Sequence, residues 1–74
     1  MDFKAASDQA TAACITLQDI ATAAGVSHNA IRRARLKKNG DSFRSPPTNW
    51  QSAIAKLARE RAAELVKLAE ELEG

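Results

Sequence analysis

The chain has 74 residues, with 11 basic and 9 acidic side chains and a net charge of +2. A chain this short forms one small domain and buries too little surface to be comfortably stable alone, which favours dimerisation. The single cysteine excludes an intramolecular disulfide and a cysteine-based zinc cluster. No apolar run approaches the ~20 residues of a membrane span, and the N-terminus lacks a signal-peptide core, so we expect a cytoplasmic protein.

The charges are unevenly distributed along the chain. Between His28 and Pro47 there are six basic side chains and one acidic one, Asp41. The last fifteen residues carry five glutamates against Arg61 and Lys67. One end of the molecule is therefore positive and suited to phosphate, and the other is expected to face water.

The first thirteen residues are rich in alanine, and Phe3 is their large apolar residue. Asp2 or Asp8 can cap a helix here, which would cover the back of the two helices that follow. Cys14 lies in an apolar run beside Ile15, where we expect it to be buried as a small hydrophobic residue.

Two short helices, about 17–24 and 28–36, are predicted within the segment 16–36. Gly25 separates two apolar faces with helical spacing. These faces consist of Leu17, Ile20, Ala21 and Ala24, and then of Val26, Ile31 and Ala34. Thr16, with Asp19 three residues later, can cap the first helix, and Ser27 can cap the second. Gly25 supplies the positive φ at the joint. This pattern predicts a helix-turn-helix, whose second helix usually enters the major groove of DNA.

Nine residues of this segment form a T-L-x-D-I-A and A-G-V-S string. They are Thr16, Leu17, Asp19, Ile20, Ala21, Ala24, Gly25, Val26 and Ser27. The segment, about a third of the chain, resembles the DNA-binding headpiece of lactose-repressor-type regulators. We expect no counterpart of the sugar-binding domain of those regulators within these 74 residues. The nine matching residues are mostly framework positions, so the resemblance specifies the fold better than the operator. The size of the chain and its basic second helix are also similar to the small phage autorepressors of anti-CRISPR operons, the anti-CRISPR-associated proteins.

The second helix carries the candidate base contacts. The resemblance implies that His28, Asn29 and Arg33 read bases, whereas the family has an uncharged residue where Arg32 stands. Helical geometry independently groups all four side chains in one outer patch. Asn can bond bidentately to adenine and Arg to guanine, so Asn29 and Arg33 are the leading candidates. His28 has no His or Cys partner for a metal site. An ordinary solvated helix face is the alternative for this patch.

A second group of residues is expected to contact the DNA backbone, from helix ends and from the loop that follows. This group consists of Thr16, Gln18, Ser27, Arg35, Lys37, Lys38 and Arg44. The basic loop spans 37–47, where Asn39-Gly40 favours a turn and Pro46-Pro47 cannot continue a helix. Phe43 is expected to anchor the loop to the core. A short two-stranded wing and a plain solvated linker are the alternatives.

A long C-terminal helix is predicted over 48–73, because no Gly or Pro interrupts it and strong helix formers dominate. Thr48 and Gln51 have the spacing of a capping box. We expect the first half to pack on the helix-turn-helix and the second half to pair with the same helix of another chain. The expected dimer interface consists of Leu57, Arg61, Leu65, Leu68 and Leu72. A tail that is unpaired, or packed within one chain, is the alternative.

The sequence thus predicts a single all-α domain, residues 1–74, with about four helices. Its expected function is that of a DNA-binding transcriptional regulator, a homodimeric repressor of a phage or plasmid operon that binds an inverted repeat. The partners are double-stranded DNA and a second copy, with no cofactor, metal, membrane or small-molecule effector. A symmetric dimer would hold its recognition helices ~34 Å apart.

Two other classes of function remain open. One is a protein-interaction module, such as an antitoxin or adaptor, that works through the long helix. The other is an excisionase-like protein that bends DNA. No enzyme is expected, because one His, one Cys, no paired buried carboxylates and no Gly-rich phosphate loop leave no active site to assemble.

Overall fold

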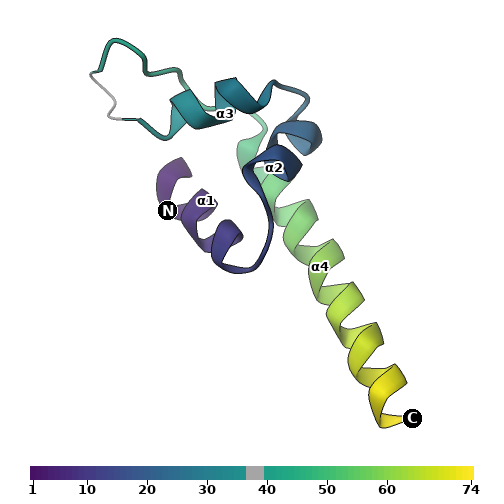
Figure 1. Cartoon of the computed structure of the whole chain (residues 1–74). Helices are drawn as coiled ribbons and strands as arrows, with labels where there is room; N and C mark the ends of the chain where they lie inside the picture. Colours follow the sequence, from purple (N-terminus) through teal and green to yellow (C-terminus); the bar gives the residue numbers. More distant parts are fainter. Residues whose placement is uncertain (37–39) are drawn as a thin grey trace.

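The computed structural model describes residues 1–36 and 40–74 and contains four α-helices in those ranges (Figure 1). They are α1 (Phe3–Ala12), α2 (Leu17–Ala24), α3 (His28–Ala34) and α4 (Trp50–Glu73). No strand occurs in the described residues, so the predicted all-α fold with a long C-terminal helix is confirmed. Within the same ranges, no helix is both long enough and apolar enough to cross a bilayer.

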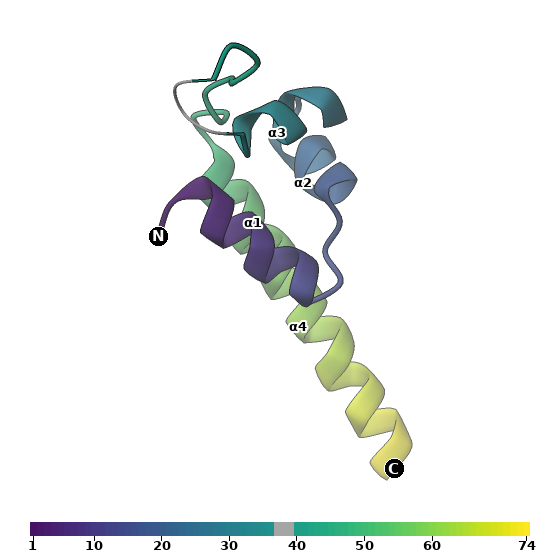
Figure 2. The same cartoon turned by 60° about the vertical axis from the view of Figure 1, so that its left-hand side comes forward.

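The helices gather at one end of α4. Helices α1 and α2 contact the first half of α4, and α3 packs on α2 (Figures 1 and 2). The second half of α4 extends beyond them, which gives the molecule its extents of 53 × 20 × 18 Å. A small helical head therefore sits on one end of a longer rod.

The core lies where α1, α2, α3 and the start of α4 meet. Its buried apolar members are Phe3, Ala10, Ile15, Ile20, Ala21, Ile31 and Ala34. The rings of Phe3 and Trp50 meet edge to face, with their centroids 5.5 Å apart and their planes at 78°. Helix α1 packs mainly on α4, and its Phe3 and Ala10 join the same core as the buried residues of α2 and α3. The cap of α1 is Asp2, whose carboxylate accepts the Ala5 N–H at 2.8 Å.

Helix α2 ends at the predicted glycine. Gly25 has a φ of 76°, and the Val26 N–H reaches back to the Ala21 carbonyl at 3.0 Å. The Gly25 N–H donates to the Thr22 carbonyl at 3.3 Å. These two bonds are a Schellman motif, which satisfies carbonyls that the helix leaves unpaired.

Helix α1 ends in the same way, but with Cys14 in the position of the glycine. Its φ is 67°, and the Ile15 N–H donates to the Ala10 carbonyl at 2.9 Å. The prediction that Cys14 is buried is wrong, because its side chain is exposed. In this motif Ala10 and Ile15 are both buried in the core, whereas the side chain of Cys14 points to solvent.

The predicted caps of α2 and α3 are confirmed. The Asp19 N–H donates to the Thr16 hydroxyl and the Thr16 N–H donates to the Asp19 carboxylate, both at 3.0 Å, so the capping box is reciprocal. The Ser27 hydroxyl accepts the Ala30 N–H at 3.1 Å. The start of each helix is therefore fixed by bonds within its own first turn.

Two predicted helix ends are wrong. Helix α3 stops at Ala34 and not at 36, because the Leu36 N–H and the returning Arg44 N–H both donate to the Arg33 carbonyl. Helix α4 begins at Trp50 and not at 48, so the expected Thr48–Gln51 capping box does not form.

The start of α4 is determined by contacts outside its own sequence. A turn precedes the helix, in which the Trp50 N–H donates to the Pro47 carbonyl at 3.1 Å. The cap position belongs to Asn49, whose side-chain amide donates to the Ala24 carbonyl at the end of α2 and makes no capping bond. This bond joins the beginning of α4 to the helix-turn-helix.

Candidate nucleic-acid interface

The buried residues of α3 fix its rotation about the helix axis. Ile31 and Ala34 lie in the core, with exposed fractions of 0% and 5%. At 100° per residue, Asn29, Arg32 and Arg33 project on the opposite side of the helix and His28 lies beside them. His28, Asn29 and Arg32 are exposed. The predicted outer patch is thus the surface that α3 presents to its surroundings.

Arg33 belongs to the same patch but is half-buried. Its carbonyl accepts the Arg44 N–H at 3.3 Å, which brings the loop back against the end of α3. The exposed Arg44 is therefore held near the patch by its own backbone. Phe43 beside it is half-buried and lines a hollow with Phe3 and Ala34, as expected of an anchor residue.

The remainder of the loop adds no wing in the part that is described. Residues 40–49 contain turns and irregular backbone, with no strand. Lys37 and Lys38, two of the expected backbone contacts, lie outside the described residues.

The N-terminus of α2 lies close to the N-terminus of α3. Thr16, Gln18 and His28 line one shallow hollow. The hydroxyls of Thr16 and Ser27 accept capping hydrogen bonds, and the Ser27 hydroxyl still has an O–H with which to donate to a phosphate. The Gln18 amide donates to the Thr22 hydroxyl at 3.3 Å. Two helix N-termini and the outer patch of α3 therefore share one surface, where the partial positive charge of the helix ends favours an anion.

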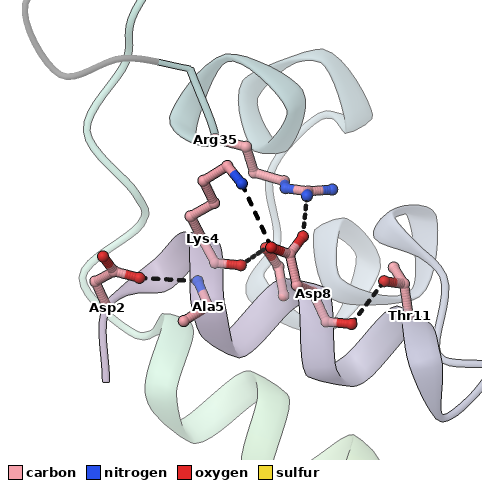
Figure 3. Close-up of polar contacts among 7 residues, drawn as sticks. Asp2, Lys4, Ala5, Asp8, Thr11 and Arg35 are labelled. Carbon is pink, nitrogen blue, oxygen red and sulfur yellow. Dashed lines mark hydrogen bonds and ion pairs between the residues drawn. The ribbon is translucent and has the colours of Figure 1, made fainter.

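Arg35 differs from the other basic residues because it has a partner inside the chain. Its guanidinium forms an ion pair with Asp8 of α1, which also accepts a bond from Lys4 at 3.4 Å (Figure 3). Its Nε atom is buried without a hydrogen-bond partner. A phosphate contact by Arg35, as the sequence suggested, would have to compete with Asp8. The ion pair was not predicted, because Asp8 and Arg35 are 27 residues apart in the sequence.

The other arginines of this surface have no such partner. The ion pairs found within 1–36 and 40–74 are those of Asp8 with Lys4 and with Arg35. Arg32, Arg33 and Arg44 are therefore left with uncompensated charge on one side of the molecule.

The expected dimer residues fall into two groups. Leu57 packs on the core, and the Arg61 guanidinium donates to the Cys14 carbonyl at 3.3 Å, so both stabilise the contact of α4 with the head. Leu65, Leu68 and Leu72 are exposed at 58%, 51% and 79%. The structure thus assigns Leu57 and Arg61 to packing within the chain and leaves the other three free.

The charge of Arg61 also acts on the cap of α2. Two hydrogen bonds from Thr16 to the Asp19 carboxylate lower the pKa of Asp19. The bond from the Thr16 backbone N–H has the larger effect, and the bond from the Thr16 side chain has the smaller one. Partial desolvation of the carboxylate opposes this effect, and the positive charge of Arg61 adds to it. Asp19 is therefore held in its charged form at the start of α2.

The fold and this surface define a small all-α protein with a basic outer face on α3. Comparisons of the chain with protein-family models, with curated proteins and with solved structures find no match. No set of three or more His, Cys, Asp or Glu residues in the described ranges could hold a metal ion.

Proposed function

We propose that the protein is a sequence-specific DNA-binding transcriptional regulator, acting as a homodimeric repressor of a phage or plasmid operon. The observation that carries the proposal is the outer patch of α3. Buried Ile31 and Ala34 orient the helix so that Asn29 and Arg32 project from it. The arginines of this surface other than Arg35 lack acidic partners among the described residues. Such charge is repulsive by itself and is relieved by a polyanion.

In this proposal α3 lies in the major groove of double-stranded DNA. Asn29 bonds an adenine edge and Arg33 a guanine edge, with Arg32 and His28 beside them. Arg44 and the N-termini of α2 and α3 contact phosphates and set the register of the protein on the duplex. Occupation of a promoter represses transcription without an effector, a cofactor or a metal ion.

The test is selection of a binding site from randomised duplexes, followed by competition against a scrambled duplex. The wild-type chain is expected to enrich one short motif and to bind it ~10³-fold or more tightly than scrambled DNA. Asn29→Ala should change the motif at one base pair. Lys67→Ala is the matched control, because Lys67 is exposed near the far end of α4 and should leave the motif unchanged. Failure to enrich any motif would contradict the proposal.

An adaptor or antitoxin is the second candidate, and it is favoured by one observation. The exposed leucines at the end of α4 form an apolar surface far from α3. A protein that works only through this surface would tolerate loss of the α3 arginines. An in vivo repression assay separates the two, because a repressor loses activity with Arg33→Ala and an adaptor does not.

A further inference from the structure

The second half of α4 exposes more apolar surface than a solitary helix would be expected to leave in water. We call residues 62–73 the tail. Four of its large apolar side chains, Leu65, Val66, Leu68 and Leu72, are exposed at 51% to 79%. The tail projects beyond α1 and α2, so the head leaves it uncovered (Figures 1 and 2).

The spacing of small and large residues in the tail is that of a helix that pairs with another helix. Ala62, Leu65, Ala69 and Leu72 follow one another at intervals of three, four and three residues, which is the heptad spacing of a coiled-coil seam. Val66 flanks the seam on one side and Leu68 on the other. The seam alternates alanine with leucine.

We propose that the tail pairs with the tail of a second copy of this chain in antiparallel orientation. This inference rests on the proposed function in one respect, namely that the repressor is a homodimer. It adds which surface forms the dimer and in which orientation the two tails pair. In one register, Ala62 lies opposite Leu72 of the second copy, and Leu65 lies opposite Ala69 of the second copy. Every layer then holds one small and one large side chain, and the layers have equal volume.

A parallel pair would pack the same residues less well. Each residue of the seam would meet its own counterpart, so that Ala62 faces Ala62 of the second copy and Leu65 faces Leu65 of the second copy. Layers of two alanines would leave gaps between layers of two leucines, and gaps forfeit packing energy. Shape therefore favours the antiparallel pair.

Charge favours the same orientation. Arg59 lies at the N-terminal end of the exposed part of α4, next to Glu60, and the C-terminal end is acidic, with Glu70, Glu71 and Glu73. In the antiparallel register, Arg59 flanks the seam beside Glu73 of the second copy, at both ends of the pair. A parallel pair would instead place the acidic ends side by side, and like charges repel.

The orientation determines how far apart the two heads lie. The centre of the antiparallel register falls near residue 67, seventeen residues after Trp50, which is ~25 Å at ~1.5 Å per residue. The two Trp50 positions would be ~50 Å apart, and α3 lies beside that end of α4, away from the tail (Figures 1 and 2). The recognition helices are then separated by more than the ~34 Å of one DNA turn.

Cysteine cross-linking tests the orientation directly. In a Cys14→Ser background, Ala62→Cys and Leu72→Cys chains are oxidised separately and as a mixture. The antiparallel register predicts a cross-linked dimer in the mixture and none in either variant alone. Cross-linking of each variant by itself would show a parallel pair and overturn the proposal, as would a chain that cross-links in no combination.

Sedimentation of the full chain supplies the second measurement. Leu65→Glu should raise the dimer dissociation constant at least tenfold, whereas Ala63→Glu, which adds the same charge on the outer side of the helix, should leave it unchanged. A wild-type chain that is monomeric at tens of micromolar overturns the inference. Retained selection of a DNA motif by such a monomer would show that the proposed DNA binding stands without it.

Discussion

Arg33 has two separable tasks, one in its backbone and one proposed for its side chain. Its carbonyl closes α3 and holds Arg44 of the loop, and an alanine at this position keeps both bonds. Arg33→Ala should therefore remove the guanidinium alone. We expect it to weaken binding to the selected motif by ~1–3 kcal/mol and to relax the preference at one base pair. Competition gel shifts with single-base variants of the motif measure both effects.

Lys67→Ala serves as the control for lost charge, since it removes one positive charge from the tail. An Arg33→Ala chain that binds the selected motif and random DNA with equally reduced affinity would assign Arg33 to phosphate and not to a base.

Gly25 and Cys14 occupy equivalent positions in two Schellman motifs, with φ values of 76° and 67°. A Cβ at Gly25 would meet no atom within 4 Å, so Gly25→Ala tests backbone strain alone. We expect Gly25→Ala to lower the free energy of unfolding by ~1–2 kcal/mol. Cys14→Gly should raise it by about 1 kcal/mol or less, because relief of strain is partly offset by the greater freedom of glycine in the unfolded chain.

Urea titrations of the wild-type chain and of the Gly25→Ala and Cys14→Gly variants measure these changes in the free energy of unfolding. Cys14→Ser is the matched control, since it removes the thiol and keeps the strain. Equal stabilisation by serine and by glycine would show that the thiol, and not the backbone, destabilises the wild-type chain.

At the scale of the helix, the cap of α2 makes stability depend on pH. The pKa of Asp19 is lower in the folded chain than its ordinary value of 3.8, because of its bonds with Thr16 and the nearby Arg61. Its contribution to stability is therefore fully present above about pH 4, and it is lost as the pH falls through the lowered folded pKa.

We expect Asp19→Asn to remove this part of the acid dependence while other carboxylates retain theirs. Urea titrations of both chains between pH 2 and 6 check the sign. If the two chains lost stability in parallel across this range, the cap would not be a source of the dependence.

The ion pair between Asp8 of α1 and Arg35, at the C-terminal end of α3, restrains one basic residue of the proposed interface. Asp8→Asn should release Arg35 from its ion pair, at a cost of no more than ~1 kcal/mol in stability, since the pair is partly exposed. A freed Arg35 beside the duplex should increase the salt dependence of DNA binding by roughly one unit of slope. The double variant Asp8→Asn, Arg35→Ala should lack this increase. An unchanged slope in Asp8→Asn would place Arg35 outside the interface.

Local signals account for much of the fold that could be predicted. Thr16, Gly25 and Ser27 each act on atoms within five residues, and the structure places all three caps as predicted. The start of α4 could not be predicted in the same way, because the bond from Asn49 to the Ala24 carbonyl joins residues 25 apart in the sequence. The exposure of Cys14 was missed because the sequence signal for a left-handed helix end is glycine.

The candidate site shows the same division. The outer patch of α3 follows from helical periodicity, because Ile31 and its neighbours determine which side is buried. The ion pair of Arg35 and the bond from Arg61 to Cys14 depend on how α1 and α4 approach the helix-turn-helix. The spacing of apolar residues along one helix does not indicate how another helix packs against it, so neither contact could be predicted from the sequence.

On the scale of the whole molecule, α3 and the tail lie at opposite ends, so the tail determines the spacing of the heads (Figure 1). Antiparallel tails hold the heads too far apart for half-sites one turn apart. Because recognition helices meet the same side of DNA at whole turns, the next allowed separation is two turns, ~70 Å. We therefore expect an operator whose half-site centres are about two turns apart.

Duplexes with two copies of the selected half-site at increasing separation test this expectation. Gel shifts of the wild-type chain should show cooperative binding that is strongest near two turns and weak at one turn. The Leu65→Glu variant should bind each half-site with unchanged affinity but without cooperativity, because the substitution disrupts only the pairing of the two tails. Ala63→Glu should retain the preference for two turns. Strongest cooperativity at one turn would instead require the heads to lie side by side, as a parallel pair of tails would hold them.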